Sequence, residues 1–165
     1  MAAVIALSNY LVQFPINHWL TWGAFSYPLV FLVCDLTNRA LGPVAARRVA
    51  WSGFAVAVAV SLAIAPWRIA LASASAFIVA QGLDIAVFNR LRQAHWWKAP
   101  LGASAAASVI DTLVFFSIAF AGSPFNWFTL ALGDLLVKLA MAVLLLAPYR
   151  LMLGRLHLWQ PSGRA

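Results

Sequence analysis

Long runs of apolar residues alternate along this chain with short connections that contain proline, glycine or basic residues. A transmembrane helix needs about 20 predominantly apolar residues, and the runs have about this length. The pattern predicts a single integral membrane domain over residues 1–165 with an all-α fold, a bundle of six transmembrane helices. We expect these helices near residues 2–14, 19–41, 50–65, 69–91, 100–121 and 126–148.

The composition supports a membrane protein, because 64% of the 165 residues are apolar and only 9% are charged. Soluble domains are about half apolar and about one quarter charged, so this chain has too little polar surface to be one of them. Its formal net charge of +7 could suggest nucleic acid. The basic residues flank apolar runs, however, so we expect membrane lipid and no nucleic acid as the partner.

Basic residues are concentrated in alternate connections, and this asymmetry predicts the orientation. The connections after the second and fourth predicted helices and the C-terminal tail contain Arg47, Arg48, Arg90, Arg92, Lys98, Arg150, Arg155 and Arg164. The connections on the opposite side contain only Arg68. By the positive-inside rule, both termini are predicted to be cytoplasmic.

Five of the six predicted helices carry polar residues within apolar surroundings, where such residues are costly unless they face an interior. The candidates are Asn9, Gln13, Asp35, Asn38, Arg39, Gln81, Asp84, Asn89 and Asp111. Residues three or four positions apart share one helical face. Asp35 and Asp84 each have an amide three positions away, which favours a shaped hydrogen-bonding site over a simple ion pair.

The alternative is that these charges only hold the helices together as ion pairs. Asp84 would then pair with Arg39 or Arg90, and Asp134 would pair with Lys138. Asp134 and Lys138 are four positions apart, so they can neutralise each other on one helix. For this pair, the sequence favours neither the structural nor the functional role.

We find no motif for catalysis or for a cofactor. The sequence contains no nucleophile motif, phosphate-binding loop or set of metal ligands at the required spacing, so we expect neither an enzyme nor a metal. Gly53, Ala57 and Ser61 follow one another at four-residue steps of the third predicted helix. Such small residues favour close helix packing, within the chain or in a homodimer.

Four segments carry a family resemblance: SNYLVQFP, TWGAFSYPLVFLVCDLTNRALGPVAARR, QGLDIAVFNRLRQ and WWKAPLGASAAASVIDTLVFFSIAF. They resemble the queuosine precursor transporter family, also called the VUT family, over almost the whole chain. The resemblance implies a six-helix fold similar to the membrane-embedded substrate-binding subunits of energy-coupling-factor transporters. It also implies import of the 7-deazaguanines preQ0 and preQ1 across the bacterial inner membrane, for queuosine modification of tRNA.

This substrate class agrees with the polar residues. A carboxylate can accept two hydrogen bonds from adjacent N–H donors of a guanine-like base, and aromatic rings can stack on its faces. The substrate-binding candidates are therefore the nine polar residues above together with Trp22, Phe25 and Tyr27. We expect Asp35, Asp84 and Asp111 to contribute most.

The competing interpretation is a non-transporting membrane scaffold or a subunit of a larger transport complex. The sequence leaves open whether an ATP-driven module takes part.

Overall fold

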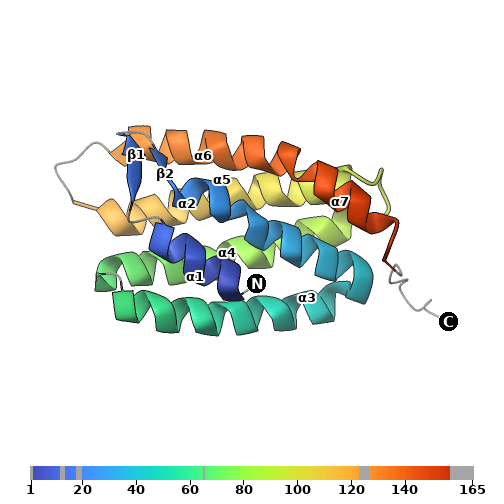
Figure 1. Ribbon diagram of the computed structural model, residues 1–165, viewed down its shortest axis with the longest axis horizontal. Helices are drawn as coiled ribbons and strands as arrows, with labels where there is room; N and C mark the ends of the chain where they lie inside the picture. The colour runs from blue at the N-terminus through green and yellow to red at the C-terminus, as the bar shows by residue number, and fades with distance from the viewer. Residues whose placement is uncertain (1, 12–13, 18–19, 65, 123–126, 157–165) are drawn as a thin grey trace.

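The computed structural model is a bundle of helices (Figure 1), and it describes all residues except 1, 12–13, 18–19, 65, 123–126 and 157–165. Its elements in chain order are α1 (Ala2–Leu11), β1 (Pro15–Asn17), β2 (Leu20–Thr21), α2 (Gly23–Ser26), α3 (Pro28–Ile64), α4 (Trp67–Leu91), α5 (Lys98–Phe120), α6 (Trp127–Leu144) and α7 (Leu146–Leu153).

Four helical stretches of the described chain are long and apolar enough to cross a membrane: Gly23–Ala63, Trp67–Leu91, Lys98–Phe120 and Trp127–Leu153. The protein is therefore a multi-pass membrane protein that is helical apart from one small hairpin. This agrees with the fold class that the hydrophobic pattern predicts.

The longest element, α3, contains a reversal at Gly42. This residue has φ 85° and ψ 175°, a backbone conformation that glycine adopts readily because it has no Cβ atom. Pro43 follows and has no N–H to continue the preceding helix. The two halves of α3, residues 28–41 and 43–64, lie side by side on either side of this point (Figure 1).

Packing between the halves confirms that they run antiparallel. Close to the turn, Cys34 of the first half shares a buried cluster with Ala50 of the second. Farther from the turn, Val30 shares a cluster with Ala57. The helices that the sequence predicts as second and third are therefore joined at Gly42, without an intervening loop.

The small-residue face of the second half of α3 is buried within the chain. Ala57 is 7% exposed and Ser61 is 3% exposed, and Gly53 is buried as well. Ala57 belongs to the same cluster as Phe77 of α4. Packing inside the chain therefore uses this face.

The strands β1 and β2 form a small antiparallel hairpin in a segment that the sequence pattern predicts to be a loop. Pro15 pairs with Thr21, and Asn17 pairs with Leu20. The hairpin occupies the start of the helix that we expect from residue 19. As a result, the following helix, α2, begins at Gly23.

The turns and connections between the helices lie at the two ends of the bundle. The turn within α3, the connection between α4 and α5, and α7 lie at one end (Figure 1), and these segments carry most of the basic residues. At the other end, the Arg68 guanidinium of α4 donates from Nε to the carbonyl of Ile118 at 3.1 Å. It also donates to the carbonyl of Ala121, and so satisfies carbonyls at the C-terminal end of α5.

Candidate functional site

Two carboxyl groups, which we call the carboxyl pair, are buried between α3, α4 and α5. Asp35 is 2% exposed and Asp84 is fully buried, and the two interact electrostatically. The Ser104 hydroxyl donates to Oδ2 of Asp35 at 3.3 Å. Among the described residues, Oδ1 of Asp35 has no hydrogen-bond partner, and both carboxyl oxygens of Asp84 lack a nitrogen or oxygen donor. The Cys34 thiol, a weak donor, lies against the Asp84 carboxyl group. Such acceptors are costly to bury, so they are candidates for contact with a ligand.

Further polar atoms near the carboxyl pair have no hydrogen-bond partner in the described part of the chain. Gln81 lies one turn before Asp84 and is 2% exposed, and neither atom of its amide is bonded. The hydroxyl groups of Ser108 on α5 and Tyr149 on α7 are also buried and unbonded. Each group of this kind destabilises a folded protein by about 1–3 kcal/mol. Their concentration in one region is typical of a site that a ligand completes.

A pocket of about 310 Å³, its open mouth included, lies beside Asp35 between the first half of α3, α5 and the α6–α7 segment. Its free space at the centre is about that of one water molecule. A ligand of nucleobase size therefore requires these helices to separate. The wall carries four polar and two aromatic side chains: Asp35, Ser104, Ser108, Lys138, Phe31 and Tyr149.

A wider groove of about 620 Å³ lies between the second half of α3 and α4. Its aromatic lining comes from Trp51, Phe54 and Phe77, and Gln81 forms part of the same wall. Gln81 is thus reached from a different side than Asp35. Asp84, three positions after Gln81, is fully buried and lines neither cavity.

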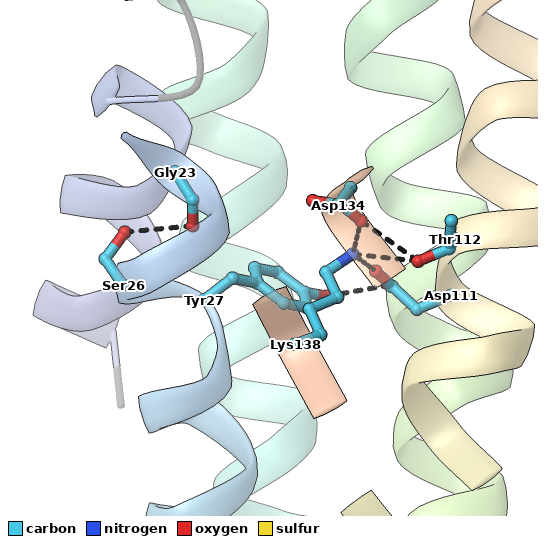
Figure 2. Close-up of polar contacts among 7 residues, drawn as sticks. All are labelled: Gly23, Ser26, Tyr27, Asp111, Thr112, Asp134 and Lys138. Carbon is cyan, nitrogen blue, oxygen red and sulfur yellow. Dashed lines mark hydrogen bonds and ion pairs between the residues drawn. The ribbon is translucent and has the colours of Figure 1, made fainter. Parts of the chain in front are cut away.

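A second polar cluster, which we call the lysine network, surrounds the ammonium group of Lys138 (Figure 2). The Lys138 Nζ lies 2.8 Å from Oδ2 of Asp111 and 2.5 Å from Oδ2 of Asp134. It also donates to Oγ1 of Thr112 at 3.2 Å, and Thr112 donates to Asp134 at 3.0 Å. The Tyr27 hydroxyl donates to Oδ1 of Asp111 at 3.1 Å. Every member of this network therefore has a hydrogen-bond or ion-pair partner within it.

The ion pairs differ from the alternative considered for the sequence. The pair of Asp134 and Lys138 is present, but Lys138 has a second partner in Asp111, 27 positions away on another helix. Asp84 forms no ion pair with any residue that the structure describes. The alternative in which it pairs with Arg39 or Arg90 is therefore wrong.

The predicted residues Asn38, Arg39 and Asn89 lie together around Arg92, at the end of the first half of α3 and the end of α4. The Arg92 guanidinium donates to the carbonyl of Asn38 at 2.8 Å, to its side-chain oxygen, and to Oδ1 of Asn89 at 2.9 Å. The Arg39 guanidinium in turn donates to the carbonyl of Arg92 at 2.8 Å. Burial and the nearby Arg39 charge lower the pKa of Arg92.

These contacts join α3 to α4, and the three predicted residues do not line the pocket beside Asp35. Arg92 was not among the predicted site residues, because the sequence pattern places it in a connection.

The predicted aromatic residues also separate into two groups. Tyr27 belongs to the lysine network, whereas Trp22 and Phe25 are 54% and 39% exposed and contact each other, with ring centroids 6.3 Å apart. The aromatic side chains of the pocket come instead from residues that we did not single out, Phe31 and Tyr149. Two predictions lie outside what the structure describes: the side chain of Asn9, and Gln13.

Ser104 and Ser108 were not predicted as site residues, although a sequence signal exists for them. With Asp111 they occupy positions i, i+4 and i+7 of α5, and residues at this spacing share one helical face. All three are buried.

Comparisons with known proteins give this geometry a context. The family model described as "Putative vitamin uptake transporter" matches residues 21–66 and 61–152. The queuosine precursor transporter of Escherichia coli is 39% identical over 176 aligned positions, which cover 88% of this chain and 79% of that protein. The chain belongs to the queuosine precursor transporter family.

Two other members of this family are also similar to the chain. The probable queuosine precursor transporter of Haemophilus influenzae is 36% identical, over 88% of this chain and 79% of its own length. The probable queuosine precursor transporter of Bacillus subtilis is 28% identical, over 78% of this chain and 69% of its own length. No solved structure is significantly similar to the chain.

The family resemblance found in the sequence is thus confirmed, and the family consists of transporters and not of enzymes.

Proposed function

We propose that this protein imports a queuosine precursor, a 7-deazaguanine such as preQ0 or preQ1, across the bacterial inner membrane. The imported base serves the queuosine modification of tRNA. The observation that carries the proposal is the 39% identity with the queuosine precursor transporter of Escherichia coli, over 88% of this chain.

The substrate site in this proposal is the pocket beside Asp35. The free Oδ1 of Asp35, together with Oδ2, accepts hydrogen bonds from adjacent N–H groups of the base. Phe31 and Tyr149 provide rings for stacking, an interaction worth about 1–3 kcal/mol per base in nucleic-acid binders. The unbonded hydroxyl of Ser108 on the same wall is available to a carbonyl or ring nitrogen of the base.

Asp84 completes the site once the helices separate. It is fully buried and already interacts electrostatically with Asp35. The pocket opens when the α6–α7 segment moves away from α3 and α5, and entry of the base then brings donors to the carboxyl pair. Gln81 lies one turn before Asp84 and supports it from the separate groove between the second half of α3 and α4.

We further propose that the chain crosses the membrane six times, in the arrangement of the substrate-binding subunits of energy-coupling-factor transporters. The stretch Gly23–Ala63 has 41 residues, about twice the 20 or so that one crossing needs, and it reverses at Gly42. It therefore contributes two crossings. The excess of basic residues at one end of the bundle supports cytoplasmic locations for both termini.

Precursor-dependent synthesis of queuosine tests the proposed function. The host is a bacterial strain that lacks its own importer and its own deazaguanine synthesis, supplied with a limiting amount of preQ0 or preQ1. We expect the chain to restore queuosine in tRNA, and Asp35→Asn to fail at equal membrane expression. Ser52→Ala is the matched control, because Ser52 is exposed and bonds only locally, to the carbonyl of Val49.

Absence of queuosine with the unaltered chain would contradict the function and favour the scaffold interpretation. The remaining alternative, a subunit of a larger transport complex, is tested with the purified chain in proteoliposomes. Precursor uptake by these vesicles would show that the chain transports without a further subunit. Uptake in cells but not in the vesicles would indicate that an additional module is required.

A further inference from the structure

We propose that the lysine network couples transport to the proton gradient, and that Asp134 is the group that binds and releases the proton. This inference rests on the proposed import function and adds the ion that drives it. The network lies in the candidate membrane-spanning stretches Lys98–Phe120 and Trp127–Leu153, and its side chains converge on the Lys138 ammonium group (Figure 2). Ionisable residues in such stretches commonly form proton pathways in transporters.

The charges of the network do not balance. It contains two carboxylates, Asp111 and Asp134, and one ammonium group, Lys138. Its other members, Tyr27 from the junction of α2 and α3 and Thr112 from α5, are neutral. No further ion pair is formed with it by the residues that the structure describes. The network therefore carries one excess negative charge, which a single proton neutralises.

Asp134 is the carboxylate that can exchange this proton. Its side chain is 16% exposed, compared with 6% for Asp111 and 6% for Lys138. Asp111 has both oxygens occupied, Oδ1 by the Tyr27 hydroxyl and Oδ2 by Lys138. The contacts of Asp134 with Lys138 and Thr112 involve only Oδ2.

A proton suits this site better than a metal cation. Hard metal ions take about six oxygen ligands, and the oxygens here already surround the Lys138 ammonium group. A metal ion would have to displace the lysine, whereas a proton needs no additional space.

The network and the substrate pocket share one residue. Lys138 forms part of the pocket wall, together with Asp35. A proton on Asp134 removes the ion pair within α6 and leaves Asp111 of α5 as the one charged partner of Lys138 in the network. It thereby changes the electrostatic surroundings of a side chain on the pocket wall. Proton binding and substrate binding then affect each other reciprocally.

The proton balance follows from this arrangement. One proton binds Asp134 while the pocket faces the outside, and it leaves to the cytoplasm when the precursor is released. The Lys138 ammonium group keeps its own protons throughout.

Proteoliposomes with the purified chain and radiolabelled preQ1 test the proposal. Exchange of internal for external preQ1 is measured without a gradient, and accumulation is measured with an acidic exterior. We expect vesicles with the unaltered chain to accumulate preQ1, and we expect this accumulation to stop when an uncoupler is added. Asp134→Asn retains exchange within about twofold but loses accumulation by about tenfold or more. Asp134→Glu, which keeps the carboxylate, restores part of the accumulation.

A pH-sensitive dye inside the vesicles gives a second measurement that needs no variant. Addition of external preQ1 to the unaltered protein should acidify the interior. Unchanged internal pH, accumulation driven by sodium alone, or full accumulation by Asp134→Asn would each overturn the proposal. Absence of preQ1 exchange by the unaltered, folded protein would instead contradict the import function itself, and the coupling with it.

Discussion

The ammonium group of Lys138 lies 2.8 Å from a carboxyl oxygen of Asp111 and thereby links α6 to α5 at a buried position. The same ammonium contacts Asp134. Removal of the lysine therefore leaves two carboxylates facing each other in an apolar region, and loss of one partner of a buried pair costs about 3–5 kcal/mol. We expect Lys138→Met to lower the melting temperature in detergent strongly.

The matched control for this prediction is the double variant Asp111→Asn with Lys138→Met, which removes opposite charges together. It should recover a substantial part of the lost stability. A single Lys138→Met variant that melts like the unaltered protein would show that the network does not hold α5 and α6 together.

Asp84 should be important for uptake and unimportant for stability. Its carboxyl group is fully buried without a nitrogen or oxygen donor in the described chain and has only the weakly donating Cys34 thiol against it there. A buried polar group that is not satisfied costs about 1–3 kcal/mol in proteins. Asp84→Asn replaces it with a neutral group of the same shape. We expect an unchanged or higher melting temperature and an uptake reduced by about tenfold, which corresponds to about 1.4 kcal/mol of lost substrate binding. A large fall in melting temperature would indicate a structural partner for Asp84.

Two glycines of the bundle should respond in opposite directions to alanine. Gly42 has φ 85° and ψ 175°, a region that is essentially restricted to glycine, and another residue held there costs about 1–3 kcal/mol. Gly82 lies within α4, and an added Cβ there would meet no atom within 4 Å, so alanine should stabilise its helix by about 0.5–1 kcal/mol. Thermal melts of Gly42→Ala and Gly82→Ala compare the two. A stabilising Gly42→Ala would mean that the reversal of α3 does not depend on this conformation.

The junction of α3 and α4 should require arginine at position 92. Nη2 of Arg92 donates to the carbonyl of Asn38 and to Oδ1 of Asn89. The guanidinium also lies over the ring of Phe88, 5.4 Å from its centroid, and the compact ammonium of a lysine does not reproduce this planar contact. We expect Arg92→Lys to destabilise the protein by about 1–2 kcal/mol, since hydrogen bonds to charged groups contribute about 1.5–3 kcal/mol. Arg90→Lys is the control, because Arg90 is exposed. Equal melting temperatures for the two variants would contradict the prediction.

The membrane-spanning character of the fold was predictable from hydrophobicity, because backbone groups in a bilayer must be satisfied within each segment and long apolar runs therefore become helices. The end of the second predicted helix at residue 41 agrees with the reversal at Gly42, but the start of the next helix was not predictable. We expect a connection from residue 42 to residue 49, whereas the second half of α3 begins directly at Pro43. The hairpin of β1 and β2 was also missed, since three- and two-residue strands are too short to produce a pattern.

For the site, burial was predictable and partners were not. Asp35, Gln81 and Asp84 are buried as expected, because polar side chains in apolar helices are excluded from lipid. The contact of Asp111 with Lys138 spans 27 positions and depends on how α5 and α6 are rotated about their axes. Helical spacing within one segment contains no information on that rotation.

The reversal at Gly42 has a mechanical consequence for transport. A connection of one residue has no slack, so the two halves of α3 cannot slide past each other and behave as one rigid hairpin. This hairpin packs against α4, and α4 packs against α5. Only 17% of the most apolar window of Trp127–Leu153 is buried, compared with 44% in each of the other three stretches. We therefore expect α3, α4 and α5 to form the frame of the transporter, and α6 with α7 to move against this frame during transport.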